Sequence, residues 1–134
     1  MNWSQEFECG LERFDTSNQC LIFVLRQVLA PGGECRGHPA CGQQASDCTK
    51  TRALQTFASR KFAFEERVMR GAEFPGLPEH AEDHRQFLSR IEMKGPPQTC
   101  LAGLSEIERI ADLWLPLHVD EFDRSFGRWT SALP

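Results

Sequence analysis

Residues 78–91 read Pro-Glu-His80-Ala-Glu-Asp-His84-Arg-Gln-Phe87-Leu-Ser-Arg-Ile91, a spacing that predicts a helix with one buried face. The two histidines share this face with Phe87 and Ile91, because intervals of three and four residues return to the same side of a helix. Pro78 precedes the pattern, and Gly and Pro residues come after it at 95–97. We therefore expect a helix over about residues 79–93.

Three more segments have this periodicity, and none alternates as a strand does. The expected helices thus lie at about 15–30, 48–70, 79–93 and 100–129. Four helices of this length, mostly on short connections, predict an all-α, up-down-up-down four-helix bundle.

The 134 residues are enough for one domain, 1–134, with one core. An N-terminal arm, 1–14, precedes the first helix. The connection at 31–47 is rich in Gly, Pro and Cys, and it is longer than bundle loops usually are.

Composition narrows the class of protein. The chain is 40% hydrophobic and 25% charged, with a net charge of −4 and interspersed acids and bases. Because no basic stripe is present, we expect no nucleic-acid partner. The longest apolar run, Leu21 to Leu25, is too short to span a membrane, and the first residues do not read as a signal peptide. We expect a cytoplasmic protein with no membrane partner.

Polar residues interrupt the inward stripe of each predicted helix at a similar depth. The stripes carry Asn18, then Lys61 and Glu65, then His80 and His84, then His118. Asp123 lies five residues after His118, about 140° around an α-helix, at the edge of that face. Buried polar groups need partners, so these side chains should converge.

The histidine pair indicates what they converge on. Residues i and i+4 present two imidazoles on one helical face, a geometry that chelates a transition metal. His118 and the carboxylates of Glu65 and Asp123 complete a candidate ligand set. The sequence therefore predicts a metal site in the core.

Four ordered segments resemble the hemerythrin family, in particular its bacterial single-domain members. The arm 3–14 leads into Asp15-x-x-Asn18-x-x-Leu21, where the family has Asp-x-x-His-x-x-Leu. The other three segments are Lys61-Phe-Ala-Phe-Glu65-Glu66-Arg-Val-Met69, Phe74-Pro75-x₄-His80-x₃-His84-x₂-Phe87 and Trp114-Leu-x₂-His118-x₄-Asp123. In the second segment the family has His-Phe-x-x-Glu-Glu-x-x-Met.

The resemblance implies a specific change in the metal site. Hemerythrins hold two irons with five histidines and two bridging carboxylates, and they bind O₂ reversibly. His80, His84 and His118 match the histidines of one iron, and Glu65 and Asp123 match the bridges. Asn18 and Lys61 stand where the other iron's two histidines would be. We expect one metal ion, with iron favoured and zinc or manganese also compatible with these ligands.

Lys61 has two interpretations. Its ammonium could replace the missing cation beside Glu65 or Asp123. Alternatively, its long stem could extend past the helix edge and leave the charge in water.

The expected function is binding or sensing of O₂, NO, redox state or metal. Reversible O₂ carriage as in the family is not expected, because its two irons each supply one electron to O₂ and one metal supplies only one. A different class of function is a metal-free interaction module with a buried Lys-carboxylate-His network and a protein partner. A mononuclear iron enzyme is a third hypothesis, and no motif indicates a substrate pocket.

Cysteines concentrate in the first loop. Cys35, His38, Cys41 and Cys48 could bind zinc, form a disulfide or redox switch, or stay free. Cys9 and Cys20 are expected to be small packing residues.

Overall fold

The computed structural model describes residues 2–29, 48–92 and 100–134. Its helices are α1 (Glu12–Leu29), α2 (Thr49–Gly71), α3 (Leu77–Ile91), α4 (Cys100–His118) and the shorter α5 (Arg124–Ser131). No strand forms within the described ranges. The predicted all-α four-helix bundle is confirmed.

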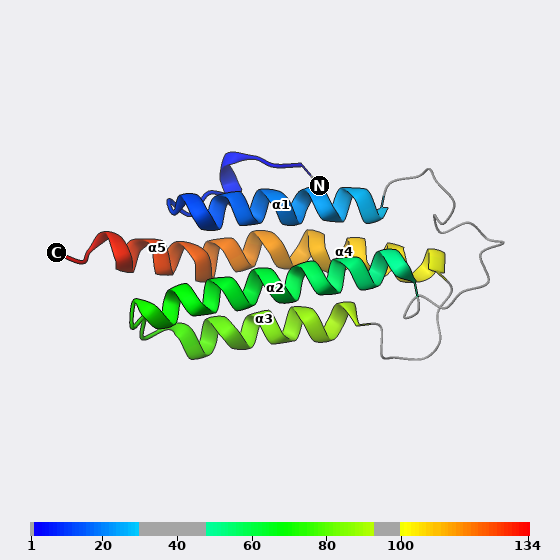
Figure 1. Cartoon of the computed structure of the whole chain (residues 1–134). Helices are drawn as coiled ribbons and strands as arrows, with labels where there is room; N and C mark the ends of the chain where they lie inside the picture. Colours follow the sequence, from blue (N-terminus) through cyan, green and yellow to red (C-terminus); the bar gives the residue numbers. More distant parts are fainter. Residues whose placement is uncertain (1, 30–47, 93–99) are drawn as a thin grey trace.

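The four long helices lie side by side and alternate in direction (Figure 1). Helix α2 packs against α1 and α3, and α4 packs against the same two helices from the other side of the bundle. This closed ring of neighbours is the up-down-up-down arrangement. α1 begins at Glu12, earlier than the sequence suggested.

The fourth helix differs from the expected single helix over 100–129. A π-helical turn, Val119–Asp123, separates α4 from α5. A π turn bonds residue i to i+5, so it takes in one extra residue and rotates the later part of the helix by about 100°. Phe122 is therefore only half-buried, whereas its neighbour Asp123 is completely buried.

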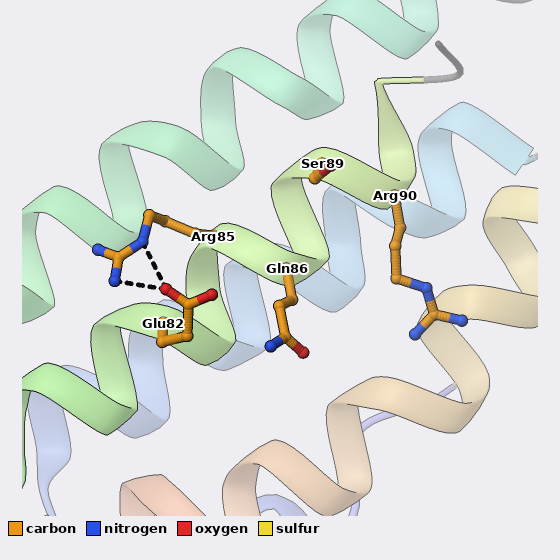
Figure 2. Close-up of a pocket in the computed structure, with 5 residues that line it drawn as sticks. All are labelled: Glu82, Arg85, Gln86, Ser89 and Arg90. Atoms are coloured by element: carbon orange, nitrogen blue, oxygen red, sulfur yellow. Dashed lines mark hydrogen bonds and ion pairs between the residues drawn. The ribbon is translucent and has the colours of Figure 1, made fainter. Parts of the chain in front are cut away.

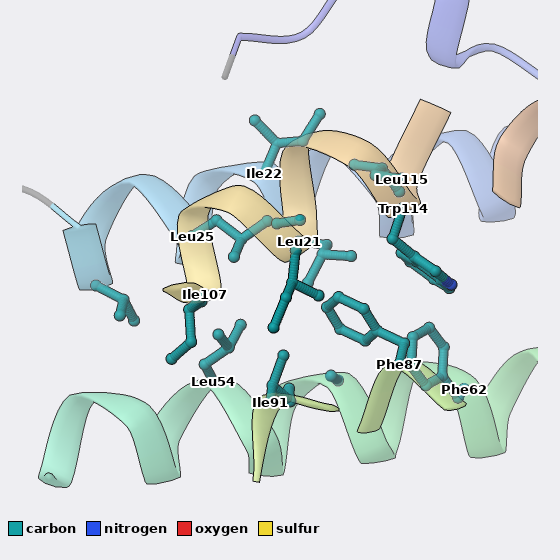
Figure 3. Close-up of a cluster of buried hydrophobic side chains, with 14 of the residues drawn as sticks. Leu21, Ile22, Leu25, Leu54, Phe62, Phe87, Ile91, Ile107, Trp114 and Leu115 are labelled. Atoms are coloured by element: carbon teal, nitrogen blue, oxygen red, sulfur yellow. The ribbon is translucent and has the colours of Figure 1, made fainter. Parts of the chain in front are cut away.

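The interior has two apolar clusters separated by a polar layer. The larger cluster fills the part of the bundle drawn in Figure 3 and includes Leu21, Leu25, Leu54, Phe87 and Ile107. The smaller one consists of Phe14, Met69, Phe74 and Phe126. Asn18 on α1 and Glu65 on α2 each lie between residues of the two clusters, so apolar side chains pack against the layer from both sides.

The turn between α2 and α3 closes the end of the bundle that holds the smaller cluster. Glu73 has a positive φ of 56°, and the Phe74 amide donates to the Met69 carbonyl. This pattern is a Schellman cap, which usually has Gly at the left-handed position. The cap directs the Phe74 ring onto Phe126, with ring centroids 4.9 Å apart.

The N-terminal arm lies along the bundle (Figure 1) and is tied to α5. Phe7, from a 3₁₀ turn at Gln5–Phe7, enters the larger cluster. The Arg124 guanidinium donates to the carbonyl oxygens of Glu8, at 2.9 Å, and Glu6. Gly127 allows the arm to pass close to α5.

The cysteine predictions have mixed outcomes. Cys9 is half-buried against the smaller cluster, but Cys20 is exposed on α1, so its expected packing role is wrong. Cys48 is buried just before α2. Cys35, His38 and Cys41 lie outside the described residues. Among the described helices, none has both the length and the apolar composition of a membrane span.

We predict that Gly127→Ala destabilises the protein by about 1–3 kcal/mol. A Cβ at this position would lie 2.4 Å from the Cys9 carbonyl oxygen, so the arm or α5 must move. Urea denaturation followed by circular dichroism measures the change. Gly71→Ala is the matched control, because its Cβ would meet no atom within 4 Å. Equal stabilities of the two variants would contradict the tight approach.

Candidate metal centre

Seven polar side chains form the layer between the apolar clusters, and none is more than 5% exposed. They are Asn18, Lys61, Glu65, His80, His84, His118 and Asp123. Each long helix contributes at least one, and the π turn contributes the last. Every inward polar position predicted from the sequence therefore lies in this layer.

The three histidines converge with Glu65. One nitrogen from each imidazole and one Glu65 oxygen all lie within 4.8 Å of one another. Asp123 joins them, because its Oδ1 is 3.1 Å from Nε2 of His80 and 3.2 Å from Nε2 of His118. The π turn explains this position, since its i to i+5 repeat puts Asp123 one turn below His118.

The donor atoms that face the centre of this group have no hydrogen-bond partner among the described residues. They are Nε2 of His80, His84 and His118, Oε2 of Glu65 and Oδ1 of Asp123. Leaving buried polar atoms unpaired costs about 1–3 kcal/mol each. Three imidazole nitrogens and two carboxylate oxygens are suitable ligands for a transition metal such as iron, zinc or manganese. The donor set therefore fits one metal ion.

The second oxygen of each carboxylate faces away from the histidines and has a partner. Lys61 Nζ donates to Oε1 of Glu65, and the Ser17 hydroxyl lies 3.4 Å from the same oxygen. Asn18 Nδ2 donates to Oδ2 of Asp123 at 2.9 Å. Because Lys61 is only 5% exposed, the interpretation that its charge is solvated is wrong.

The electrostatics of the layer favour a cation near the imidazoles. Burial opposes the ionised forms of Glu65 and Asp123. The charge of Lys61 outweighs this effect at Glu65 and lowers the pKa of its carboxyl. The charge of His118 does the same at Asp123 and lowers the pKa of that carboxyl. Burial also opposes protonation of His118, but the charge of Asp123 and the hydrogen bond to Asp83 raise its pKa to about 9. Burial lowers the pKa of His80.

Two acidic residues that sequence reasoning missed orient the histidine rings. Nδ1 of His84 lies 2.8 Å from Oε2 of Glu66, and Nδ1 of His118 lies 2.7 Å from Oδ2 of Asp83. Because ionised carboxylates only accept hydrogen bonds, these contacts put the hydrogen on Nδ1 and aim Nε2 at the centre. Glu66 belongs to a segment that resembles the hemerythrin family, but neither residue lies on an inward stripe.

Aromatic rings hold the imidazoles from the side of the larger cluster. Phe62 stacks on His84 with ring centroids 4.0 Å apart, and Trp114 stacks on His118 at 4.3 Å. The histidines therefore have little freedom to rotate out of the layer.

Comparison with known proteins agrees with this architecture. The chain is 24% identical over 121 residues to a myohemerythrin from Riftia pachyptila, across 90% of this chain and 86% of the relative. No family model matches the chain, and no solved structure matches it significantly. The similarity runs through all four helices. The fold is a hemerythrin-like four-helix bundle whose interior contains a histidine and glutamate group that could hold a metal ion.

Proposed function

We propose that this protein is a hemerythrin relative that holds one metal ion, iron, and binds or senses O₂ or another diatomic molecule. The ligands would be His80, His84 and His118, with Glu65 and Asp123 as the carboxylate ligands. The observation that carries the proposal is the set of five buried donor atoms that face one point without a hydrogen-bond partner.

The partners of the carboxylates support one metal rather than two. A second ion on the far side of the carboxylates would need Oε1 of Glu65 and Oδ2 of Asp123. Lys61 and Asn18 already donate to these two oxygens. The ammonium of Lys61 also supplies positive charge where hemerythrins have a second iron, so it acts as a charge substitute.

A single iron supplies one electron to a bound diatomic ligand, whereas bulk O₂ carriage in hemerythrins uses two irons. Sensing of O₂, NO or redox state therefore suits this site better than O₂ storage. The chain's own residues supply a dry, rigid environment, because stacked aromatic rings and the hydrogen bonds to Glu66 and Asp83 hold the histidines in place.

A metal-free interaction module is the competing function. The Lys61–Glu65 and Asn18–Asp123 contacts would be part of its buried polar network. Its weakness is the energetic cost of the five donor atoms that the network leaves unpaired. Metal analysis separates the two functions.

We predict about one iron per chain in the core when protein without a histidine tag is purified under anaerobic conditions. Elemental analysis measures the metal content, and absorption spectra with and without O₂ or NO measure the response. His118→Ala should lower the iron content several-fold, because it removes a ligand and uncovers the charge of Asp123. Protein that is purified without metal and does not bind added Fe(II) would support the interaction module instead.

Two controls separate the core from the cysteine-rich loop. His38→Ala changes the one histidine of the sequence that is not in the proposed ligand set, and it should leave the iron content unchanged. The triple change of Cys35, Cys41 and Cys48 to Ser removes any zinc held by the loop. Two metals in this triple variant would contradict a single-metal core.

We predict that Lys61→Met destabilises the protein by about 3–5 kcal/mol, because it leaves one oxygen of a buried carboxylate without its cation. Methionine keeps most of the bulk of the lysine stem, so lost packing contributes little. Denaturant unfolding measures the change. Lys50→Met, on the same helix but half-buried, should change stability by less than about 0.5 kcal/mol. Equal effects of the two changes would show that the charge of Lys61 is not required.

We predict that the paired change Asn18→His with Lys61→His creates a second metal site. Both new imidazoles would lie beside the carboxylate oxygens that Asn18 and Lys61 now contact. The variant should bind about two irons per chain and develop the absorption bands of an oxo-bridged pair in air. Each single change is a control, because one histidine gives the second ion fewer ligands. A double variant that still binds one iron would refute the substitution argument.

A further inference from the structure

A hollow of about 510 Å³ lies on the outer face of α2 and is lined by Arg60, Ala63, Glu66, Arg67 and Arg70. At 100° per residue, the three arginines fall within about 80° of the helix circumference. All three are exposed, and the small side chain of Ala63 leaves space between them. The hollow is therefore a concentrated basic surface on a protein of net charge −4.

These arginines have no ion-pair partner among the described residues. Three other guanidinium groups are neutralised locally: Arg85 pairs with Glu82 (Figure 2), Arg109 with Glu106 and Arg124 with Asp120. The one acid that lines the hollow, Glu66, is engaged by His84. The positive charge of this surface is consequently available to an external anion.

Glu66 connects the hollow to the metal centre. Its side chain is 24% exposed, and its Oε2 lies 2.8 Å from Nδ1 of His84. The other nitrogen of the same ring is one of the five donor atoms that face the centre. Two side chains and one hydrogen bond thus link the basic surface to the proposed iron.

We propose that this basic hollow is the docking site for the acidic surface of a one-electron donor protein, which reduces the core metal by way of Glu66 and His84. The inference rests on the proposed function, because it requires a metal that changes oxidation state. One electron leaves the reduced centre of the donor, and iron(III) becomes iron(II). No covalent bond forms or breaks. Negative charge on the donor complements the three unpaired arginines.

The first experiment tests docking and needs no metal. Hexacyanochromate(III), a redox-inert paramagnetic anion, is added to ¹⁵N-labelled protein. The amide signals of residues 60–70 should broaden before those of the rest of the chain. In Arg60→Gln/Arg67→Gln this selectivity should be lost. The control Arg85→Gln/Arg109→Gln removes the same charge from arginines that are already paired, and it should keep the selectivity. Broadening spread evenly over the surface would overturn the proposal.

The second experiment tests the electron route in iron-loaded protein. Reduced plant-type ferredoxin, an acidic one-electron donor, is mixed with the oxidised protein in a stopped-flow instrument. Arg60→Gln/Arg67→Gln should slow reduction at least about tenfold at low ionic strength, the range that electrostatic steering provides. Reduction by the cation hexaammineruthenium(II) should not slow.

Each failure has a separate meaning. If the control pair Arg85→Gln/Arg109→Gln slows ferredoxin as much as the test pair does, net charge rather than the hollow is responsible and the proposal is wrong. If the protein takes up no iron, the proposed function fails in the metal analysis, and the proposed electron delivery fails with it. Selective broadening by hexacyanochromate(III) together with the arginine-dependent rate supports the inference.

Discussion

Two carboxylates buried inside a four-helix bundle are the constraint on which this structure depends. Glu65 and Asp123 are completely buried, and neither apolar cluster can compensate for their charge. Every long helix contributes at least one polar side chain to the layer that contains the two carboxylates. The bundle therefore has a fixed register, because sliding one helix along its neighbours would separate a carboxylate from its partner and place it against apolar side chains.

The carboxylates also divide the polar layer into two halves. One oxygen of each faces the three imidazoles, and the other faces Lys61 or Asn18. In the half with Lys61 and Asn18, protein groups donate to both carboxylate oxygens, whereas the carboxylate oxygens that face the imidazoles have no hydrogen-bond partner among the described residues. Under the proposed function, the ammonium of Lys61 would supply positive charge on one side of the carboxylates and a metal ion would supply it on the other.

Periodicity predicted the fold and most of the site, because a stripe at intervals of three and four residues determines which side chains point inward. The contact between Lys61 and Glu65 is also predicted by the sequence, because the two residues are four positions apart on one helix. The position of Asp123 could not be derived from α-helical spacing, since a π turn changes the angle per residue. Glu66 and Asp83 were missed because each contacts a histidine on a different helix, and the pattern of a single helix does not encode its rotation against its neighbours.

The π turn has a consequence for the far end of the molecule. Its extra residue sets the rotational phase of all of α5, so the turn that carries Asp123 to the centre also carries Phe126 into the smaller cluster and brings Gly127 against the arm. An uninterrupted α-helix would present different residues to both places. The extra residue of the π turn thus couples the position of Asp123 in the polar layer to the packing of the N-terminal arm against α5. Removing this residue would disturb both.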